Sequence, residues 1–328
     1  MQQRRIGHSG LNSSALGLGC MGMSEFYGAT DEAQSLATLE AALAAGVTLF
    51  DTADAYGFGH NEQLLGRFLA SHRGQALVAT KCGLAREAGS YARRVDNSPA
   101  YIRQACEASL ARLGVEAIDL FYLHRLNLDT PLEESMGALA RLRQEGKIRA
   151  VGLCEVSAAT LRRAAALCPV AAVQSEYSLW TREPEQGVLA ACRDVGASFF
   201  AYSPLGRGFL TGAIADAASL DAGDFRQFNP RFAADNLARN QAIVAHVQQL
   251  ARAKGCTPAQ LALAWLLAQG DDIIPIPGTK RIAYLHDNLG ALAVQLDGAD
   301  LAAMHAAFPL GMAAGARYTD EGMKGVDA

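Results

Sequence analysis

Residues 49–57 read Leu49-Phe50-Asp51-Thr52-Ala53-Asp54-Ala55-Tyr56-Gly57, a short apolar run that ends in an acidic residue. The same pattern recurs at Thr80-Lys81 and at Leu123-His124, where two further apolar runs end in a titratable side chain. Between such runs lie longer segments whose apolar residues recur at helical spacing, a pattern typical of repeated βα units. Residues 49–57 therefore predict a strand that carries a reactive side chain at its carboxyl end.

Apolar runs of this kind recur along the whole chain, and each is nearly continuous because a parallel strand covered by helices has no face toward water. They predict a parallel (β/α)8 barrel, a TIM barrel, formed by residues 1–328 as a single domain. An open, doubly wound sheet is the main alternative. The predicted strands are Leu16–Cys20, Thr48–Asp51, Ala76–Lys81, Ile118–His124, Arg149–Leu153, Val170–Gln174, Ser198–Tyr202 and Ile273–Ile276.

The segments outside the strands also predict particular structures. Before the first strand, Arg4–Ile6 and Ser13–Leu16 predict an N-terminal β-hairpin that closes the floor of the barrel. After the seventh strand, Leu205–Asn236 is too long for an ordinary connection, and we expect either a flap over a ligand or a mobile insertion. Capping residues predict helices over 30–46, 98–114, 130–146 and 257–270.

The composition excludes several classes of partner. With 29 basic and 33 acidic residues, the formal net charge of −4 gives no general attraction for nucleic acid or anionic membranes. The first residues lack the apolar core of a secretory signal, and no stretch is apolar for the ~18 residues of a membrane span, so we expect a cytoplasmic protein. The seven cysteines are scattered without a Cys-x-x-Cys pair, which predicts free thiols and no metal site.

The reactive side chains fall at one place in the predicted barrel. Asp51, Lys81 and His124 end three strands, and the carboxyl ends of barrel strands meet at the rim where barrel enzymes carry their active sites. Tyr56 follows Asp51 on the same loop. Each residue alone also has a structural explanation, such as capping a turn or reaching water. Because packing does not require titratable groups at three strand ends, the set predicts a catalytic group.

These four side chains have complementary chemistry. A tyrosine with the usual pKa of about 10 is a weak acid at neutral pH, and we expect the Lys81 ammonium to lower the pKa of Tyr56. Asp51 would keep Lys81 charged, and His124 would polarise and orient a carbonyl group. Since no Ser–His or Cys–His arrangement supplies a nucleophile, we expect the missing reactant to be a hydride from a nicotinamide cofactor.

Two glycine-containing segments could bind such a cofactor. Residues 17–22 match the G-x-G-x-x-G spacing of a Rossmann dinucleotide site, but the next helix start lies at Thr30-Asp31, too far away to meet a pyrophosphate. Residues 276–281, Ile-Pro-Gly-Thr-Lys-Arg, leave the last strand and enter a helix, where backbone amides and two cations favour the 2′-phosphate of NADPH. An ordinary helix start with a solvated basic pair is the alternative.

Together these motifs resemble the aldo-keto reductase superfamily, from residues 17–22 to the region of Asn288. The resemblance covers Leu49–Gly57 with Asn61-Glu62, then Thr80-Lys81 and Tyr122-Leu123-His124. It implies a (β/α)8 barrel, NADPH as cofactor, and a catalytic tetrad of Asp51, Tyr56, Lys81 and His124. It also implies a set of cofactor contacts that spacing does not show, namely Gln174, Tyr202, Ser203, Leu205, Arg207, Gly278, Thr279, Lys280, Asp287 and Asn288.

Two positions depart from the family pattern. Cys154-Glu155 stands where many members have Ser-Asn or Ser-Glu, so a thiol replaces one hydroxyl contact to the nicotinamide carboxamide. Tyr284 lies near the position where well-known members carry an arginine for the 2′-phosphate, so preference for NADP would rest on Lys280 and Arg281. The sequence is most similar to the bacterial and plant branch that includes pyridoxal reductases and auxin-induced homologues.

The sequence thus predicts an NADPH-dependent reductase of aldehydes or ketones, with Tyr56 as general acid. The alternative is a nicotinamide-binding sensor with little turnover, because potassium-channel β subunits resemble the same family. We expect a small-molecule carbonyl substrate in an apolar, partly aromatic pocket. The candidate pocket residues are Phe26, Tyr27, Leu126 and Trp180.

Overall fold

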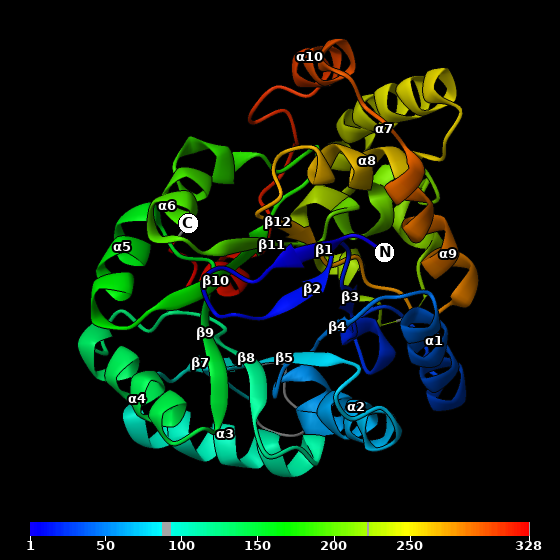
Figure 1. Cartoon of the computed structure of the whole chain (residues 1–328). Coiled ribbons are helices and arrows are strands. Elements are labelled where there is room, and N and C mark those ends of the chain that lie inside the picture. Colours follow the sequence, from blue (N-terminus) through cyan, green and yellow to red (C-terminus); the bar gives the residue numbers. More distant parts are fainter. Residues whose placement is uncertain (87–92, 222, 328) are drawn as a thin grey trace.

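The protein is described from a computed structural model that covers residues 1–86, 93–221 and 223–327 (Figure 1). Eight parallel strands form one sheet in the order β12-β11-β10-β9-β8-β5-β4-β3, so strands that follow each other in this list are neighbours. The strands are β3 (Leu18–Gly19), β4 (Leu49–Asp51), β5 (Leu77–Cys82), β8 (Ile118–Leu123), β9 (Ile148–Cys154), β10 (Val170–Glu176), β11 (Ser198–Tyr202) and β12 (Ile273–Pro275).

The first and last strands of this sheet meet, which closes it into a barrel. Gly17 N–H donates to Pro275 O at 3.0 Å, and Gly19 N–H donates to Pro277 O at 3.1 Å. A side chain at Gly19 would bring its Cβ within 3.0 Å of Ile276 O, so the close approach of the two strands needs a glycine there. Residues 17–22, which match a dinucleotide fingerprint in spacing, therefore begin at the barrel seam. The predicted (β/α)8 barrel is confirmed, and the open sheet is wrong.

Helices surround the barrel and begin and end close to the predicted caps (Figure 1). The Asp31 carboxylate accepts from Gln34 N–H at 2.8 Å, and Thr257 forms a capping box with Gln260. The helices are α1 (Glu32–Ala44), α2 (His60–Ser71), α3 (Pro99–Leu113), α4 (Leu132–Gln144), α5 (Ala158–Leu167), α6 (Val188–Val195), α7 (Ala234–Lys254), α8 (Pro258–Leu267), α9 (Ile282–Gly290), α10 (Gly298–Ala307) and α11 (Asp320–Met323).

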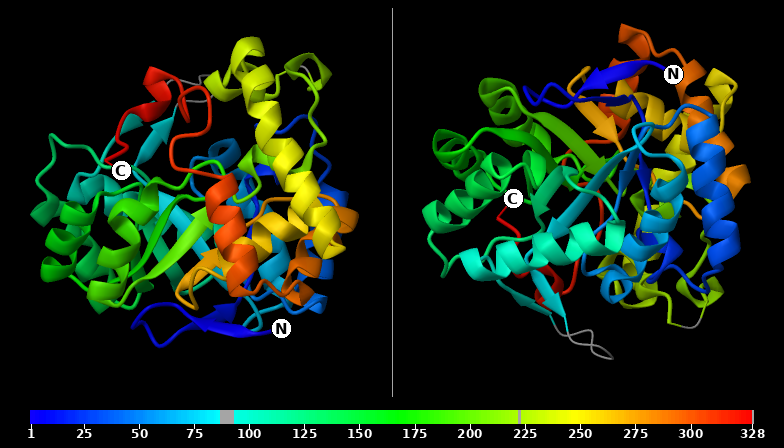
Figure 2. Two further views of the ribbon diagram at one scale, coloured as in Figure 1. Left: turned by 90° about the horizontal axis from the view of Figure 1, so that it is seen from above. Right: turned by 60° about the horizontal axis from the view of Figure 1, so that its bottom comes forward.

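The predicted N-terminal hairpin is present as the antiparallel pair β1 (Gln3–Arg5) and β2 (Asn12–Ser14). Ile6 in its turn is fully buried and packs with the side chains that fill the barrel interior. Gly7 N–H donates to Ser198 Oγ at 2.8 Å, at the first residue of β11. The hairpin thus covers the amino-terminal end of the strands, and both views of Figure 2 place it at the end opposite the C-terminal tail.

Two features of the carboxyl-terminal rim were not predicted in this form. An additional hairpin, β6 (Leu84–Arg86) with β7 (Arg93–Val95), follows β5 directly. The described residues of the long loop Leu205–Asn236 include four short 3₁₀ helices, η4 (Gly206–Thr211), η5 (Ala217–Ser219), η6 (Phe225–Phe228) and η7 (Pro230–Phe232). Phe225 N–H donates to Phe26 O at 3.1 Å, so the loop reaches across the rim to the segment after β3. Closure of this loop over a cofactor stays a prediction.

The structure also bears on the expectations that the cysteines are free thiols and that the chain has no membrane span. Within the described part of the chain all seven cysteines are free thiols, and all but Cys256 are buried. Among these same residues, the structure contains no helix long and apolar enough to span a membrane.

Candidate active site

The ammonium of Lys81 connects three of the four predicted catalytic residues. It forms a hydrogen-bonded ion pair with Asp51, donates to Thr52 O at 2.7 Å, and lies 3.4 Å from the Tyr56 hydroxyl. The geometry follows from the sheet, because Asp51 ends β4 and Lys81 lies near the end of the neighbouring strand β5. Lys81 is fully buried and Asp51 nearly so. The ion pair is therefore shielded from water. Attraction between opposite charges is stronger in the less polar interior of a protein than in water.

His124 completes the group from the next strand. It follows β8, and its N–H donates to Cys82 O at 2.7 Å, which fixes its backbone against the end of β5. The imidazole lies edge-on to the Tyr56 ring, with 5.8 Å between ring centroids and 81° between planes. The structure thus brings all four predicted side chains together at one rim.

A strained turn presents Tyr56 to this rim. Gly57, Phe58 and Gly59 all have left-handed backbone angles, with φ of 56°, 55° and 88°. Glycine adopts this region freely, whereas Phe58 does so at a cost, and such strain is common at functional sites. Asn61 stabilises the loop, because it accepts from Thr52 Oγ1 at 2.6 Å and donates to Cys20 O at 2.9 Å.

Burial changes the expected acidity of Tyr56. Desolvation raises the pKa of its hydroxyl above the usual value, and the opposing effect of Lys81 is smaller. Burial is the largest single effect on the pKa of Lys81 and lowers it, but Asp51, Tyr56 and Cys154 together outweigh it, so that this pKa lies above its usual range. The expected lowering of the Tyr56 pKa by Lys81 is present, but burial has the larger effect, so the pKa of the hydroxyl stays above its usual value. Tyr56 holds its proton at neutral pH, as a proton donor must.

Two carboxyl groups lie close to the catalytic residues, a fully buried one on Glu62 and a half-buried one on Asp54. Glu62 accepts from Thr80 Oγ1 at 2.6 Å and from Arg112 Nε at 2.6 Å. Asp54 donates its backbone N–H to Lys81 O at 3.1 Å, and burial together with Glu62 raises the pKa of its carboxyl to about 8. The position of Asp54 between Asp51 and Tyr56 is the only sequence signal that could have singled it out.

The predicted nicotinamide contacts lie beside the catalytic group. Gln174 on β10 donates to Asp51 Oδ2 at 2.8 Å. Tyr202 ends β11, and its hydroxyl donates to Glu155 Oε1 at 2.6 Å. Ser203 follows in a left-handed conformation with φ of 48°, which turns the chain sharply at the strand end. Cys154, at the end of β9, is buried.

The predicted pyrophosphate contacts follow directly after β11. Arg207 forms a buried ion pair with Glu176 at 2.7 Å, and Leu205 is half-buried at the start of the same turn. Arg207 Nη1 and Ser175 Oγ are buried without a hydrogen-bond partner among the residues that the structure describes. Buried polar groups are nearly always paired, and a dinucleotide carries phosphate and amide acceptors for both donors. These residues therefore fit a nicotinamide dinucleotide.

The aldo/keto reductase family model matches residues 15–308. This chain belongs to the aldo/keto reductase family. It is 45% identical to the aldo-keto reductase yakc of Schizosaccharomyces pombe, whose name includes NADP(+), over 96% of this chain and 94% of the relative. It is 43% identical to the probable aldo-keto reductase 1 of Glycine max, over 97% and 92% of the two chains. The family expected from the sequence is confirmed, and the protein is an oxidoreductase.

Solved structures agree with the fold of this aldo-keto reductase. A glycerol dehydrogenase from Gluconobacter oxydans matches with a TM-score of 0.85 and 31% identity, covering 93% of this chain and 94% of that one. An aldo-keto reductase from Bacillus halodurans, solved in its holo form, matches with a TM-score of 0.79 and 28% identity, covering 98% and 99%.

The basic turn of this aldo-keto reductase lies where the sequence predicted, after β12. Gly278 pairs with Gly19 across the barrel seam, and Thr279 Oγ1 accepts from Arg281 N–H at 3.1 Å. Lys280 Nζ donates to Tyr27 O at 2.7 Å and also to Ala29 O. Two of its three donors therefore hold the loop after β3, an arrangement that the sequence did not reveal.

The predicted adenine contacts lie on α9. The Asp287 carboxylate accepts from Thr257 Oγ1 at 2.9 Å and from Gln260 Nε2 at 3.0 Å, at the amino-terminal end of α8. Asn288 beside it is buried. The Asp287 carboxylate thus links α9 to the start of α8. This contact gives the side chain a structural role whether or not it binds adenine.

The four candidate pocket residues have different neighbours. Phe26 and Tyr27 pack against Phe225, with ring centroids 5.7 and 5.2 Å apart. Leu126 follows β8 and is buried. Trp180 is only 3% exposed and stacks on Phe209 at 5.0 Å, beneath the long rim loop. The geometry favours a packing role for Trp180 and leaves the other three at the rim.

Proposed function

We propose that this aldo-keto reductase is an NADPH-dependent carbonyl reductase that acts on aldehydes or ketones. The observation that carries the proposal is the Lys81 ammonium, which lies 3.4 Å from the Tyr56 hydroxyl and is paired with Asp51. A half-buried tyrosine that keeps its proton, beside a buried cation, is suited to donate that proton to an oxygen atom that becomes negatively charged.

Each member of the group has a distinct role in this proposal. Tyr56 donates its proton to the carbonyl oxygen as negative charge develops there. Lys81 stabilises the tyrosinate that remains, and Asp51 keeps Lys81 charged against the cost of burial. His124, beside the Tyr56 ring, donates a hydrogen bond to the same oxygen and orients the carbonyl group. NADPH, when bound, supplies the hydride.

The cofactor proposal rests on the residues after β9 to β12. Gln174 would bind the carboxamide and Tyr202 would stack on the nicotinamide ring. Ser203, Leu205 and Arg207 would contact the pyrophosphate, and the unpartnered Arg207 Nη1 supports this assignment. The remaining proposed contacts are Gly278, Thr279 and Lys280 for the 2′-phosphate, with Asp287 and Asn288 for the adenine.

Support for NADPH over NADH comes from two sources. The Schizosaccharomyces pombe relative has NADP(+) in its name. Lys280 and Arg281 place two cations at the turn before α9, and Lys280 keeps a third donor besides the two that bond Tyr27 O and Ala29 O. A 2′-phosphate is an acceptor that NADH lacks.

Steady-state turnover tests the proposal. A panel of aliphatic and aromatic aldehydes and ketones is assayed with NADPH and with NADH, and oxidation of the cofactor is followed by its absorbance. We expect many turnovers per active site and a higher kcat/KM with NADPH. Tight binding of NADPH followed by a single slow oxidation would instead support the cofactor-sensing class of protein.

A further inference from the structure

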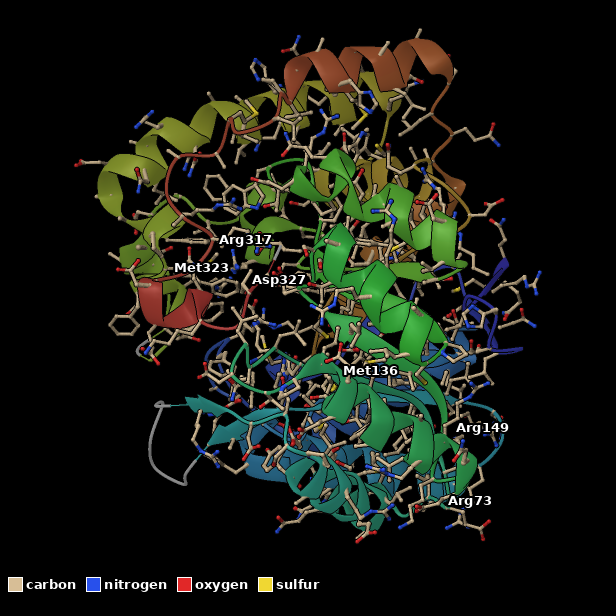
Figure 3. All side chains as sticks on the ribbon, turned by 90° about the vertical axis from the view of Figure 1, so that its left-hand side faces the viewer. Arg73, Met136, Arg149, Arg317, Met323 and Asp327 are labelled. Carbon is tan, nitrogen blue, oxygen red and sulfur yellow. The ribbon has the colours of Figure 1, made fainter. Side chains whose placement is uncertain are left out.

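The C-terminal tail, residues 309–327, returns to the carboxyl-terminal rim of the barrel after α10. Figure 3 labels Arg317, Met323 and Asp327 along this segment. Leu126 N–H donates to Gly325 O at 3.2 Å, and Asn229 Nδ2 donates to Arg317 O at 2.8 Å. The tail therefore contacts both the loop after β8 and the long loop after β11.

Glu155, directly after β9, is the main anchor of the tail. Its fully buried carboxylate accepts from Arg317 Nη1 and Nη2 at 3.2 and 2.8 Å. Its carbonyl oxygen accepts from Asp327 N–H at 2.9 Å, and the Asp327 carboxylate accepts from Ser157 Oγ at 2.9 Å. Glu155 itself has a left-handed backbone with φ of 53°, which a residue with a side chain adopts only when its surroundings stabilise it.

Glu155 also connects the tail to Tyr202. The Tyr202 hydroxyl donates to Glu155 Oε1 at 2.6 Å, and the Tyr318 hydroxyl lies 2.9 Å from the same Tyr202 oxygen. A tyrosine has one hydroxyl proton, and a carboxylate only accepts, so Tyr318 is the donor in the second bond. The Tyr202 hydroxyl is thereby hydrogen-bonded on two sides, to Glu155 after β9 and to Tyr318 in the tail.

Tyr318 makes a second contact through its ring. The Arg207 guanidinium carbon lies 4.7 Å from the centroid of this ring, a cation–π geometry. Arg207 is in turn paired with Glu176 at 2.7 Å. One side chain of the tail thus contacts both Tyr202 and Arg207, the residues on either side of the sharp turn at Ser203.

We propose that Tyr318 is a positioning residue that couples docking of the C-terminal tail to binding of the nicotinamide half of the cofactor. The inference rests on the proposed stacking of the nicotinamide on Tyr202. Because the hydroxyl of Tyr202 is fixed by Glu155 and Tyr318, its ring has a defined orientation when the tail is docked. Coupling is reciprocal, so a bound nicotinamide also favours the docked tail.

Replacing Tyr318 by Phe tests the hydroxyl alone, since the ring that contacts Arg207 remains. Loss of one hydrogen bond is expected to raise the Kd of NADP+ by about two- to tenfold, measured by quenching of protein fluorescence. The Kd of adenosine 2′,5′-bisphosphate, which has the 2′-phosphate but no nicotinamide, should stay unchanged. Lys324→Ala is the matched control, because Lys324 lies on the same tail and forms an ion pair with Glu321.

The outcomes separate this inference from the proposed function. If Tyr318→Phe weakens both ligands equally, or neither, Tyr318 does not position the nicotinamide end and the inference is wrong. If the unaltered protein binds neither ligand, the cofactor assignment itself fails. Hydrogen exchange on the unaltered protein gives a second test without any variant: NADP+ should slow exchange of the Asp327 amide, and adenosine 2′,5′-bisphosphate should not. Equal protection by both ligands contradicts the coupling.

Discussion

The carboxyl group of Asp54, near the catalytic residues, has an environment unlike that of an ordinary surface carboxyl group. Burial is the main cause that raises its pKa to about 8, and its Oδ1 atom has no hydrogen-bond partner within the described residues. In the folded protein this group stays protonated over a pH range in which the unfolded chain has already released the proton. It therefore makes stability depend on pH.

We predict that Asp54→Asn stabilises the protein increasingly as the pH rises from about 4 to 8. A raised pKa means that the folded state binds more protons than the unfolded state in this range, so the native protein loses stability as the pH rises. The variant has no such proton and avoids the loss, on the order of a few kcal/mol at pH 8. Thermal midpoints at several pH values measure the difference.

The exposed Asp235, in the first turn of α7, offers a matched control. Asp235→Asn should show a difference from the unaltered protein that stays nearly constant over the same pH range. A constant difference for Asp54→Asn as well would show that the Asp54 carboxyl is not held protonated by the fold.

Some properties of individual residues could be predicted from the sequence and others could not. Asp51, Lys81 and His124 could be predicted to meet because strand ends of a barrel share one rim, and Tyr56 because it lies on the same loop. The pKa of Tyr56 could not be predicted, because the cost of burying its hydroxyl depends on neighbours from other strands. Tyr318 was missed for the same reason, since it is 116 residues from Tyr202.

At the scale of elements, packing inside the barrel requires small residues on particular strands. A Cβ atom at Gly152 on β9 would lie 2.3 Å from the ring of Tyr122 on β8, which is fully buried. No flexible end of a side chain is available to move there. Gly137 on α4, by contrast, has no heavy atom within 4 Å of an added Cβ, apart from its own helix backbone.

We predict opposite effects for the two corresponding alanine variants. Gly152→Ala should destabilise the protein by about 1–3 kcal/mol or more, because it overpacks the barrel. Gly137→Ala should stabilise it by about 0.5–1 kcal/mol, since alanine favours a helix. Urea unfolding measures both. A neutral Gly152→Ala would mean that β8 and β9 are not packed as the structure shows.

The elements themselves were largely predictable. Every strand of the barrel overlaps a predicted one, and β11 has the predicted bounds, because continuous apolar runs bounded by turn residues identify buried parallel strands. The hairpin of β6 and β7 was not predicted, because its three-residue strands carry no apolar alternation. The 3₁₀ helices after β11 were likewise not predicted, because they lie within a glycine-containing loop.

On the scale of the whole molecule, both ends of the chain pack on the barrel. Ile6 fills the floor, and Asp327 bonds Glu155 at the opposite rim. The seam at Gly17 and Gly19 joins the first and last strands. We propose that residues 1–328 form a single domain, because neither terminus can leave without exposing part of the barrel.

This proposal predicts one cooperative unfolding transition. Far-ultraviolet circular dichroism follows the helices, and fluorescence follows Trp180 and Trp265, which are both buried. The two signals should change at the same urea concentration, as expected for one cooperative unit. Separate transitions would indicate that part of the chain folds independently of the barrel.

Tyr56 is the proposed proton donor, and one variant separates the effect of its hydroxyl from that of its ring. Tyr56→Phe removes the hydroxyl that lies 3.4 Å from Lys81 Nζ and leaves the ring beside His124. Turnover of an aldehyde substrate with NADPH should fall by about a hundredfold or more, whereas the Kd of NADPH should stay within about twofold. Reduction of aldehydes at the unaltered rate by Tyr56→Phe would show that Tyr56 is not the proton donor.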